Sequence, residues 1–265
     1  MTGRLYREDP LTPAEREEFK EDLIVVCDRE LDLLADVRGH HVLYAGGSSL
    51  LWIEGISQRI GKDGSVTALD LDAERVEEAQ ERLEEAELVA PVRLIAGDVF
   101  EVPFPPNTFD LVYSAGFLHE LDVLERTAEE ALAVLVSAVR PGGRLATSDF
   151  VDTEPSIQLE DERLQADLAR EVFGSKLYGI GSPERLVALH EELLVDVRWR
   201  ISPPGPIRHL DKVVLDAGEP EELSSLPLEI ARRLRDGWVY LTGCIRREGY
   251  TRPATLYVEG LVSDG

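Results

Sequence analysis

Two aspartates follow short apolar runs, at places where a chain commonly leaves a β-strand. Asp70 comes directly after the run 65–69, and Asp98 follows the run 92–96. A carboxylate at the first position can accept hydrogen bonds from both ribose hydroxyls of a nucleoside, and one at the second from an adenine amino group. We include their neighbours Leu71 and Val99 in the predicted site. Each aspartate also suits a turn, and that alternative stays open.

A run of small residues precedes both aspartates. Residues 42–49 read VLYAGGSS, so an apolar run leads into Gly46, Gly47 and Ser48 and then into a helical pattern. Glycine lets the backbone approach a ligand closely, and a helix N-terminus offers free N–H donors. The run therefore predicts a ligand-binding loop that includes Tyr44, although such a turn also occurs for purely conformational reasons.

A fourth apolar run brings a histidine towards the same place. Residues 109–121 read FDLVYSAGFLHEL, which delivers Ser114 and His119 past the end of a predicted strand. The unperturbed pKa of histidine, about 6.5, suits a general base, so His119 is the candidate catalytic residue. Packing against a ligand or capping a helix are the alternative roles for His119.

The spacing of apolar residues predicts the elements that position these side chains. Strands are expected at 41–45, 65–69, 92–96, 109–114 and 144–148, with helices at 12–37, 50–60, 72–88 and 123–139. Such alternation is typical of an α/β fold, with a mostly parallel sheet covered by helices on both faces. Ligands of such sheets bind outside the carboxyl ends of the strands, so the four loops are expected to share one crevice.

The second half of the chain is less regular. Helices are predicted at 156–173 and 183–192 and strands at 195–201 and 255–262, with a turn at 141–143. Residues 226–247 suit a long helix, although 238–241 also suit a strand. We expect one domain over 1–265, with a cofactor-binding core at 40–150 and substrate cap elements at 1–39 and 150–250. Phe117, Phe173, Tyr178 and Trp238 are candidates for an apolar acceptor pocket.

Composition limits the function classes. The 265 residues carry a formal net charge of −24, which argues against a general nucleic-acid binder, because phosphate contacts require a basic surface. No apolar stretch reaches the length of a membrane span or resembles a secretory signal, so a cytoplasmic protein is expected. The two cysteines form no C-x-x-C pair, and we expect no metal site.

Taken together, these features resemble the class I S-adenosylmethionine-dependent methyltransferases, and most of all the branch of ubiquinone and menaquinone C-methyltransferases. The resemblance rests on 42–49, Asp70, the Gly97-Asp98 pair, the stretch PFPPNTFDLVY at 103–113 and the stretch VRPGGRLATSD at 139–149. It implies a Rossmann-like sheet of seven strands with an antiparallel last strand. It also implies S-adenosyl-L-methionine as cofactor and a small-molecule acceptor; a homodimer is compatible with it.

The resemblance assigns roles by position. Gly46 matches the first loop glycine, Asp70 the ribose acid and Asp98 the adenine acid, while His119 falls where the family often has a histidine. The chain departs from the family pattern at Tyr44, where an acid is usual, and at Ser48 and Leu50, where glycines are usual. These departures keep one alternative open: a domain that binds the cofactor or its demethylated product without catalysis. A nicotinamide-dependent oxidoreductase on a similar sheet is a further alternative, although the loop lacks the G-x-G-x-x-G pattern of such enzymes.

Overall fold

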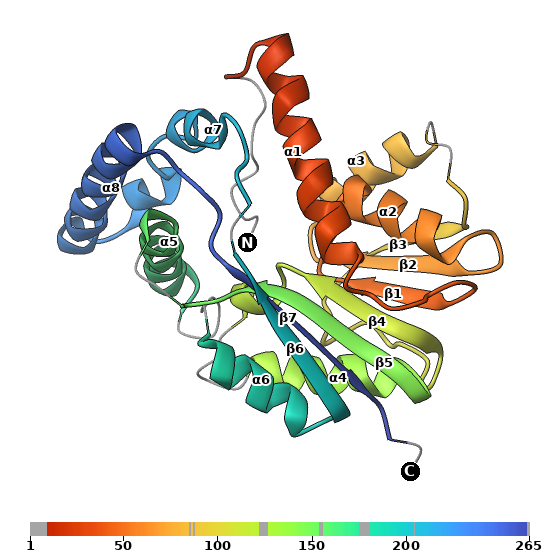
Figure 1. Ribbon diagram of the computed structural model, residues 1–265. Helices are drawn as coiled ribbons and strands as arrows, with labels where there is room; N and C mark the ends of the chain where they lie inside the picture. The colour runs from red at the N-terminus through yellow and green to blue at the C-terminus, as the bar shows by residue number, and fades with distance from the viewer. Residues whose placement is uncertain are drawn as a thin grey trace.

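The computed structural model describes residues 10–84, 86, 88–121, 127–153, 156–174, 181–203 and 205–263. Within these residues one sheet of seven strands has the order β3-β2-β1-β4-β5-β7-β6 (Figure 1). The strands are β1 (His41–Ala45), β2 (Ser65–Asp70), β3 (Val92–Ala96), β4 (Phe109–Ala115), β5 (Val139–Phe150), β6 (Val195–Ser202) and β7 (Thr255–Leu261). β7 runs antiparallel to both of its neighbours, and the pairs among β1 to β5 are parallel. The α/β class and the antiparallel strand predicted from the sequence are confirmed.

The centre of the sheet explains where the site must lie. β1 is buried along its last four residues and pairs with β2 on one side and β4 on the other. The chain thus leaves β1 in one direction and returns to its other side through β4, which makes the β1–β4 boundary the topological switch point. Because Ala45 pairs with Leu69 and Tyr44 with Tyr113, the carboxyl ends of these strands lie level with one another.

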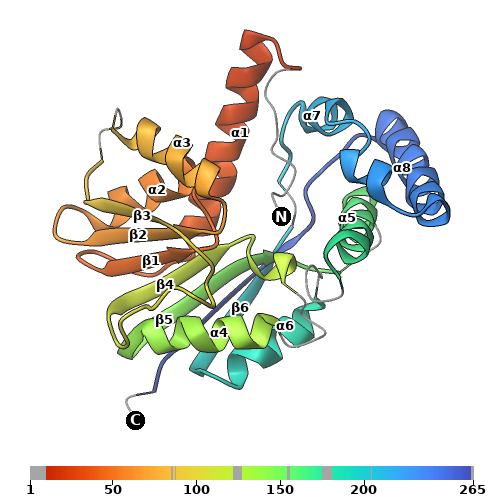
Figure 2. The same cartoon turned by 180° about the vertical axis from the view of Figure 1, so that it is seen from behind.

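Helices cover both faces of the sheet (Figures 1 and 2). On one face α2 (Leu50–Ile60), α3 (Ala73–Leu83) and the end of α1 (Pro13–Leu31) pack on β1, β2 and β4. On the other face α4 (Thr127–Ala138) and α6 (Pro183–Glu191) pack on β4, β5 and β7. Burial of these two apolar layers is the main stabilising contribution to the sheet.

A third apolar cluster lies beyond the carboxyl ends of the strands. It joins the outer part of α1 to α7 (Leu210–Asp216) and α8 (Leu228–Glu248), and α5 (Ile157–Phe173) packs against α8. Two short 3₁₀ helices, η1 (Leu118–Glu120) and η2 (Glu221–Ser225), complete the elements. The helices α1, α5, α7 and α8 therefore stand around the end of the sheet where the sequence predicts the site (Figure 1).

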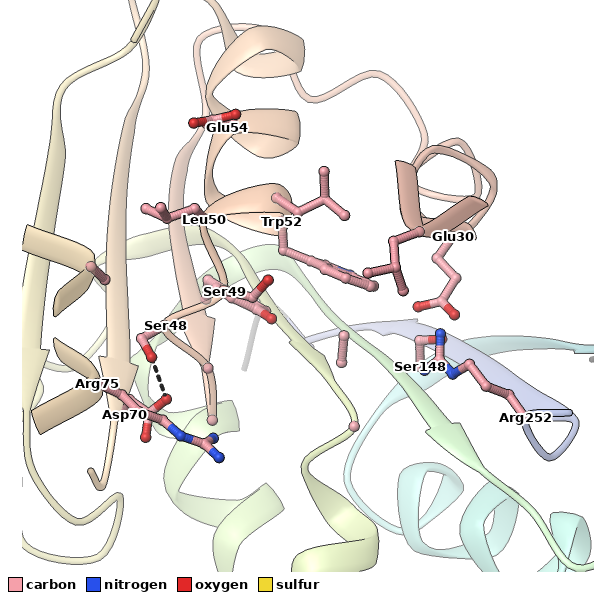
Figure 3. A pocket seen from close by; sticks show the side chains of 18 of the residues that line it. Glu30, Ser48, Ser49, Leu50, Trp52, Glu54, Asp70, Arg75, Ser148 and Arg252 are labelled. Atoms are coloured by element: carbon pink, nitrogen blue, oxygen red, sulfur yellow. Dashed lines mark hydrogen bonds between the residues drawn. The ribbon is translucent and has the colours of Figure 1, made fainter. Parts of the chain in front are cut away.

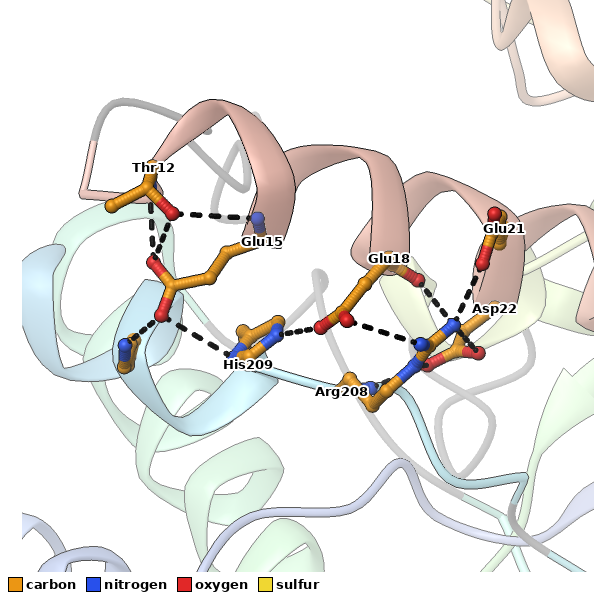
Figure 4. Close-up of polar contacts among 8 residues, drawn as sticks. Thr12, Glu15, Glu18, Glu21, Asp22, Arg208 and His209 are labelled. Carbon is orange, nitrogen blue, oxygen red and sulfur yellow. Dashed lines mark hydrogen bonds and ion pairs between the residues drawn. The ribbon is translucent and has the colours of Figure 1, made fainter.

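An ionic clasp joins α1 to the start of α7 (Figure 4). The Nε of Arg208 lies 2.9 Å from Asp22 Oδ2, and the Nε2 of His209 lies 2.7 Å from Glu18 Oε2. Arg208 also pairs with Glu21 and Glu18, and Lys212 pairs with Glu15. We call this set the α1–α7 clasp; its members are Glu15, Glu18, Glu21, Asp22, Arg208, His209 and Lys212.

Most predicted elements agree with the structure, and the differences have local causes. The acidic helix predicted at 72–88 is α3, which begins after Asp72 and ends earlier than predicted, at Leu83; Asp72 caps its start by accepting from the N–H groups of Glu74 and Arg75. The turn predicted at 141–143 instead lies inside β5, where the register against β4 shifts between Phe109 and Leu111. The strand alternative for 238–241 is wrong, since these residues belong to α8, and α7 was not predicted.

Candidate functional site

One cavity of about 800 Å³ opens at the carboxyl ends of β1, β2, β4 and β5 (Figure 3). This volume falls in the usual range of small-molecule sites. Its walls come from the loop after β1, from the sides of α1, α2 and α3, and from the first residue of β7. Among the residues predicted from the sequence, it is lined by Tyr44, Gly46, Gly47, Ser48 and Asp70. The structure therefore brings the glycine loop and the first aspartate to one cavity.

The glycine loop is fixed by its own contacts. Gly46 has φ of +79°, and a Cβ there would lie 2.3 Å from the ring of Phe117. A Cβ on Gly47 would lie 2.6 Å from the hydroxyl of Tyr44. Both glycine N–H groups donate to the carbonyl of Leu69, each at 2.9 Å. The glycines are thus required by packing, and their two N–H groups are used within the protein rather than offered to the cavity.

Asp70 ends β2 and points its carboxylate at the loop. Its Oδ2 accepts from the Ser48 hydroxyl at 2.8 Å, and its Oδ1 accepts from the Asp72 N–H at 2.9 Å. A serine at position 48 therefore does what a glycine could not, because its side chain orients the carboxylate from across the loop (Figure 3). A hydroxyl-bearing ligand can replace the serine as donor to the same oxygen.

Tyr44 is held inside the protein. Its ring stacks on Tyr113 with the centroids 6.0 Å apart, and only 2% of its surface is exposed. Burial raises the pKa of Tyr44 above its ordinary value of 10, so the phenol stays neutral. It cannot supply the negative charge that the family usually places at this position.

His119 forms a buried pair with Asp149, which was not singled out from the sequence. Its Nδ1 lies 2.8 Å from Asp149 Oδ1, and the other carboxylate oxygen accepts from the N–H groups of Phe117 and Leu118. Burial lowers the pKa of His119, but the charge and hydrogen bond of Asp149 outweigh it and raise the value to about 9. The imidazole is therefore protonated near neutral pH, where it anchors the loop after β4 and is poorly suited to accept a proton.

The remaining predicted residues lie outside the cavity lining. Leu71 is exposed, Val99 is packed in the apolar core, and Ser114 is fully buried with no partner for its hydroxyl among the described residues. Asp98 follows the strand next to Asp70, and its Oδ1 accepts from the Phe100 N–H at 2.9 Å. This contact is the turn role that the sequence left open, and it occupies one oxygen of Asp98.

The apolar acceptor pocket predicted from aromatic residues does not form as expected. Phe117 packs against the glycine loop in the core, and Trp238 belongs to the cluster between α1, α7 and α8. Neither lines the cavity. The Phe173 side chain and the whole of Tyr178 lie outside the described residues.

Sequence reasoning missed the polar residues that line the far wall of the cavity. They are Glu30 on α1, Trp52 on α2, Ser148 and Asp149 on β5, and Arg252 before β7. Glu30 carried no signal, because it is one of many acids in an amphipathic helix. Asp149 stands at the end of the VRPGGRLATSD stretch, which could have pointed to it. Among the described helices, none is long and apolar enough to cross a bilayer.

Comparisons with known proteins agree with this arrangement. Residues 42–143 match the model of a family described as "Methyltransferase domain". Over 121 residues the chain is 31% identical to a ubiquinone/menaquinone biosynthesis C-methyltransferase of Pseudoalteromonas translucida, which covers 45% of this chain and 46% of that protein. The chain thus spans about half the length of this curated relative.

Solved structures share the fold at low identity. A cyclopropane-fatty-acyl-phospholipid synthase-like protein from Lactobacillus casei superposes with a TM-score of 0.66 at 15% identity, covering 94% of both chains. The [4+2]-cyclase SpnF gives a TM-score of 0.57 at 16% identity, covering 91% of this chain and 81% of its own. These likenesses concern the fold, which carries more than one chemistry.

Proposed function

We propose, from the premise that the chain belongs through residues 42–143 to the class I S-adenosylmethionine-dependent methyltransferases, that it transfers a methyl group from this cofactor to a small molecule. The observation that carries the proposal is the meeting of Asp70 and the glycine loop at one cavity of about 800 Å³. The net charge of −24 supports a small acceptor over a nucleic acid.

The residues present fit the nucleoside part of the cofactor. Asp70 offers two acceptor oxygens at the end of β2, and one of them is now satisfied only by the exchangeable hydroxyl of Ser48. The Gly46 and Gly47 N–H groups donate to the carbonyl of Leu69. The contacts proposed for the nucleoside do not depend on these N–H groups, because the cofactor has no phosphate. Asp98 and Val99, after the neighbouring strand, are proposed to meet the adenine, with Leu71 beside them.

When bound, S-adenosylmethionine would supply an electrophilic methyl group on a sulfonium, which an electron pair of the acceptor can take up while the C–S bonding pair stays on sulfur as a thioether. The protein's work is to align the acceptor and exclude water. In this proposal Gly46, Gly47 and Ser114 shape the site between β1 and β4. The Asp149–His119 pair holds the loop after β4 in place.

The proposed role of His119 as general base has a consequence for the pH dependence of methyl transfer. With a pKa of about 9, it accepts a proton efficiently only at alkaline pH. An acceptor that must lose a proton to His119 would therefore be methylated faster as the pH rises towards 9. An acceptor whose attacking atom is already unprotonated needs no base.

A second candidate is a domain that binds the cofactor or its demethylated product without transfer. It is favoured by Tyr44, which is buried and uncharged where the family has an acid. Its discriminating measurement is a labelled-methyl assay against a metabolite pool. Tight cofactor binding without any transfer would favour this candidate.

Calorimetric titration with S-adenosylmethionine and S-adenosylhomocysteine tests the proposed function. We expect binding by the wild type and at least about a tenfold weaker affinity in Asp70→Asn, which is about 1.4 kcal/mol. The matched control is Asp63→Asn, an exposed aspartate in the turn before β2. Absence of binding by the wild type at millimolar ligand would contradict both candidates, and unchanged affinity in Asp70→Asn would contradict the ribose role.

A further inference from the structure

The cavity has two ends with different chemistry (Figure 3). Ser48, Asp70 and Arg75 lie at one end, and Glu30, Ser148 and Arg252 lie at the other, with Trp52 and Ser49 between them. The first end is the proposed nucleoside site. The second end is formed by α1, β5 and the segment before β7, and the proposed function assigns it no ligand.

Glu30 is a buried acid that lines this second end. It lies in the last turn of α1 with only 3% of its surface exposed. Its Oε1 is buried and has no hydrogen-bond partner among the described residues. Burial raises the pKa of Glu30, and the nearby Arg252 guanidinium and Ser148 hydroxyl offset this only in part. A buried carboxylate oxygen without a partner is costly, unless a ligand completes it.

Arg252 supplies the opposite charge in the same place. Its guanidinium lies over the ring of Phe150, with the carbon 5.0 Å from the ring centroid. His119 contacts the same ring, with the centroids 4.9 Å apart, so Phe150 packs against both cations. No carboxylate of a described residue lies within ion-pair distance of Arg252. Its planar donors are therefore held by the ring and available to a ligand carboxylate.

We propose that Glu30 and Arg252 bind the zwitterionic α-amino-acid group of a ligand, with the carboxylate of Glu30 receiving its ammonium and the guanidinium of Arg252 its carboxylate. A ligand with only one charge would leave the other side chain unsatisfied in the cavity. The unpartnered Oε1 of Glu30 requires a donor, and the guanidinium of Arg252, which lines the same end of the cavity, offers donors to an acceptor. An α-amino acid provides both on one carbon atom.

Two molecules carry this group in the proposed reaction, on which the inference rests. One is the cofactor, whose methionyl part extends from the ribose. The other is an acceptor that is itself an amino acid. In the first case α1 supplies the carboxylate that Tyr44 cannot. In the second, the same residues determine which acceptor is methylated.

The experiment compares ligands that differ only in the amino-acid group. S-adenosylhomocysteine, its deaminated analogue and 5′-methylthioadenosine are titrated into the wild type, Glu30→Gln and Arg252→Gln. Glu54→Gln and Arg82→Gln, which line the same cavity, serve as matched controls. Thermal unfolding and the affinity for methylthioadenosine, which lacks the amino-acid group, report whether each variant is folded.

If the group belongs to the cofactor, Glu30→Gln and Arg252→Gln each weaken S-adenosylhomocysteine binding at least about tenfold and leave methylthioadenosine unchanged. The deaminated analogue is then insensitive to Glu30→Gln. If the group belongs to the acceptor, both variants bind S-adenosylhomocysteine normally. In that case a panel of standard amino acids and N-methylglycine shows binding to the wild-type complex that both variants lose.

The inference is overturned if both variants bind S-adenosylhomocysteine like the wild type and no amino acid binds. The proposed function fails in a different way, because the wild type would then bind neither S-adenosylmethionine nor methylthioadenosine. In that case the panel of amino acids is titrated into the protein without cofactor. Absence of binding by every amino acid then overturns the inference.

Discussion

The buried pair of His119 and Asp149 makes the stability of the protein depend on pH in a defined direction. In the unfolded chain the imidazole has its ordinary pKa of 6.5, and in the folded protein the value is about 9. A folded-state pKa above the unfolded value means that the folded protein binds the proton more tightly. The contribution is therefore complete below pH 6.5 and is lost as the pH rises through 9.

The magnitude follows from the two pKa values. Each pKa unit corresponds to about 1.4 kcal/mol, so the pair contributes about 3 kcal/mol when fully protonated. Between about pH 7 and pH 9 roughly 2 kcal/mol of this is lost. Glu120 and Glu162 also face the imidazole, and burial raises the pKa of Glu162 to about 7. Most of the effect of Glu162 on stability lies between its ordinary pKa of 4.5 and about 7, so the range from pH 7 to 9 reports mainly on His119.

The assay is chemical denaturation of the wild type and of His119→Gln at several pH values from 7 to 9. We expect the free energy of unfolding to fall by about 2 kcal/mol more in the wild type than in the variant. His190→Gln is the matched control, because His190 is also buried but burial lowers its pKa to about 4, which places its effect below pH 6.5. Parallel pH profiles for the wild type and His119→Gln would refute the reasoning.

Three further predictions concern the loop, the buried tyrosine and the clasp. Gly46→Ala should lower the free energy of unfolding by at least about 2 kcal/mol in chemical denaturation, because φ is +79° and the new Cβ would clash with Phe117. A decrease in the free energy of unfolding of less than half this value would show that the loop relaxes easily. Tyr44→Asp introduces the acid that is usual in the family, yet it should lower the free energy of unfolding by about 3 kcal/mol or more, since it removes the stack on Tyr113 and buries a charge. It should not improve cofactor affinity, and tighter cofactor binding in calorimetry would contradict this prediction. Arg208→Gln should speed amide hydrogen exchange in α7, and high salt should do the same in the wild type, because the α1–α7 clasp is exposed to solvent. Exchange rates that change in neither experiment would show that the apolar cluster alone holds α7.

The sequence by itself determined the elements of the sheet and the loop that faces the cavity. Strands β1 and β3 and helix α2 have the bounds that their apolar patterns predict, because period and turn residues are local properties of the chain. The place of Asp70 at a strand end, beside the glycine loop, also follows from local order combined with the rule for parallel sheets. Leu50 begins α2 where the family has a glycine, and the helix forms with the predicted bounds.

Only the tertiary structure decided the charges around the cavity. The pairing of His119 with Asp149 joins residues 30 positions apart, and the charge and hydrogen bond of Asp149, which outweigh burial, turn a candidate base into a protonated anchor. Glu30 and Arg252 meet at one wall although more than 200 residues separate them in the sequence. Residue type and spacing cannot predict such meetings, because burial and the distance between charges are set by packing across the whole fold. The sequence predicts the end of the sheet at which a ligand-binding cavity forms. The packing of α1 against β5 and the start of β7 determines which charged groups line that cavity.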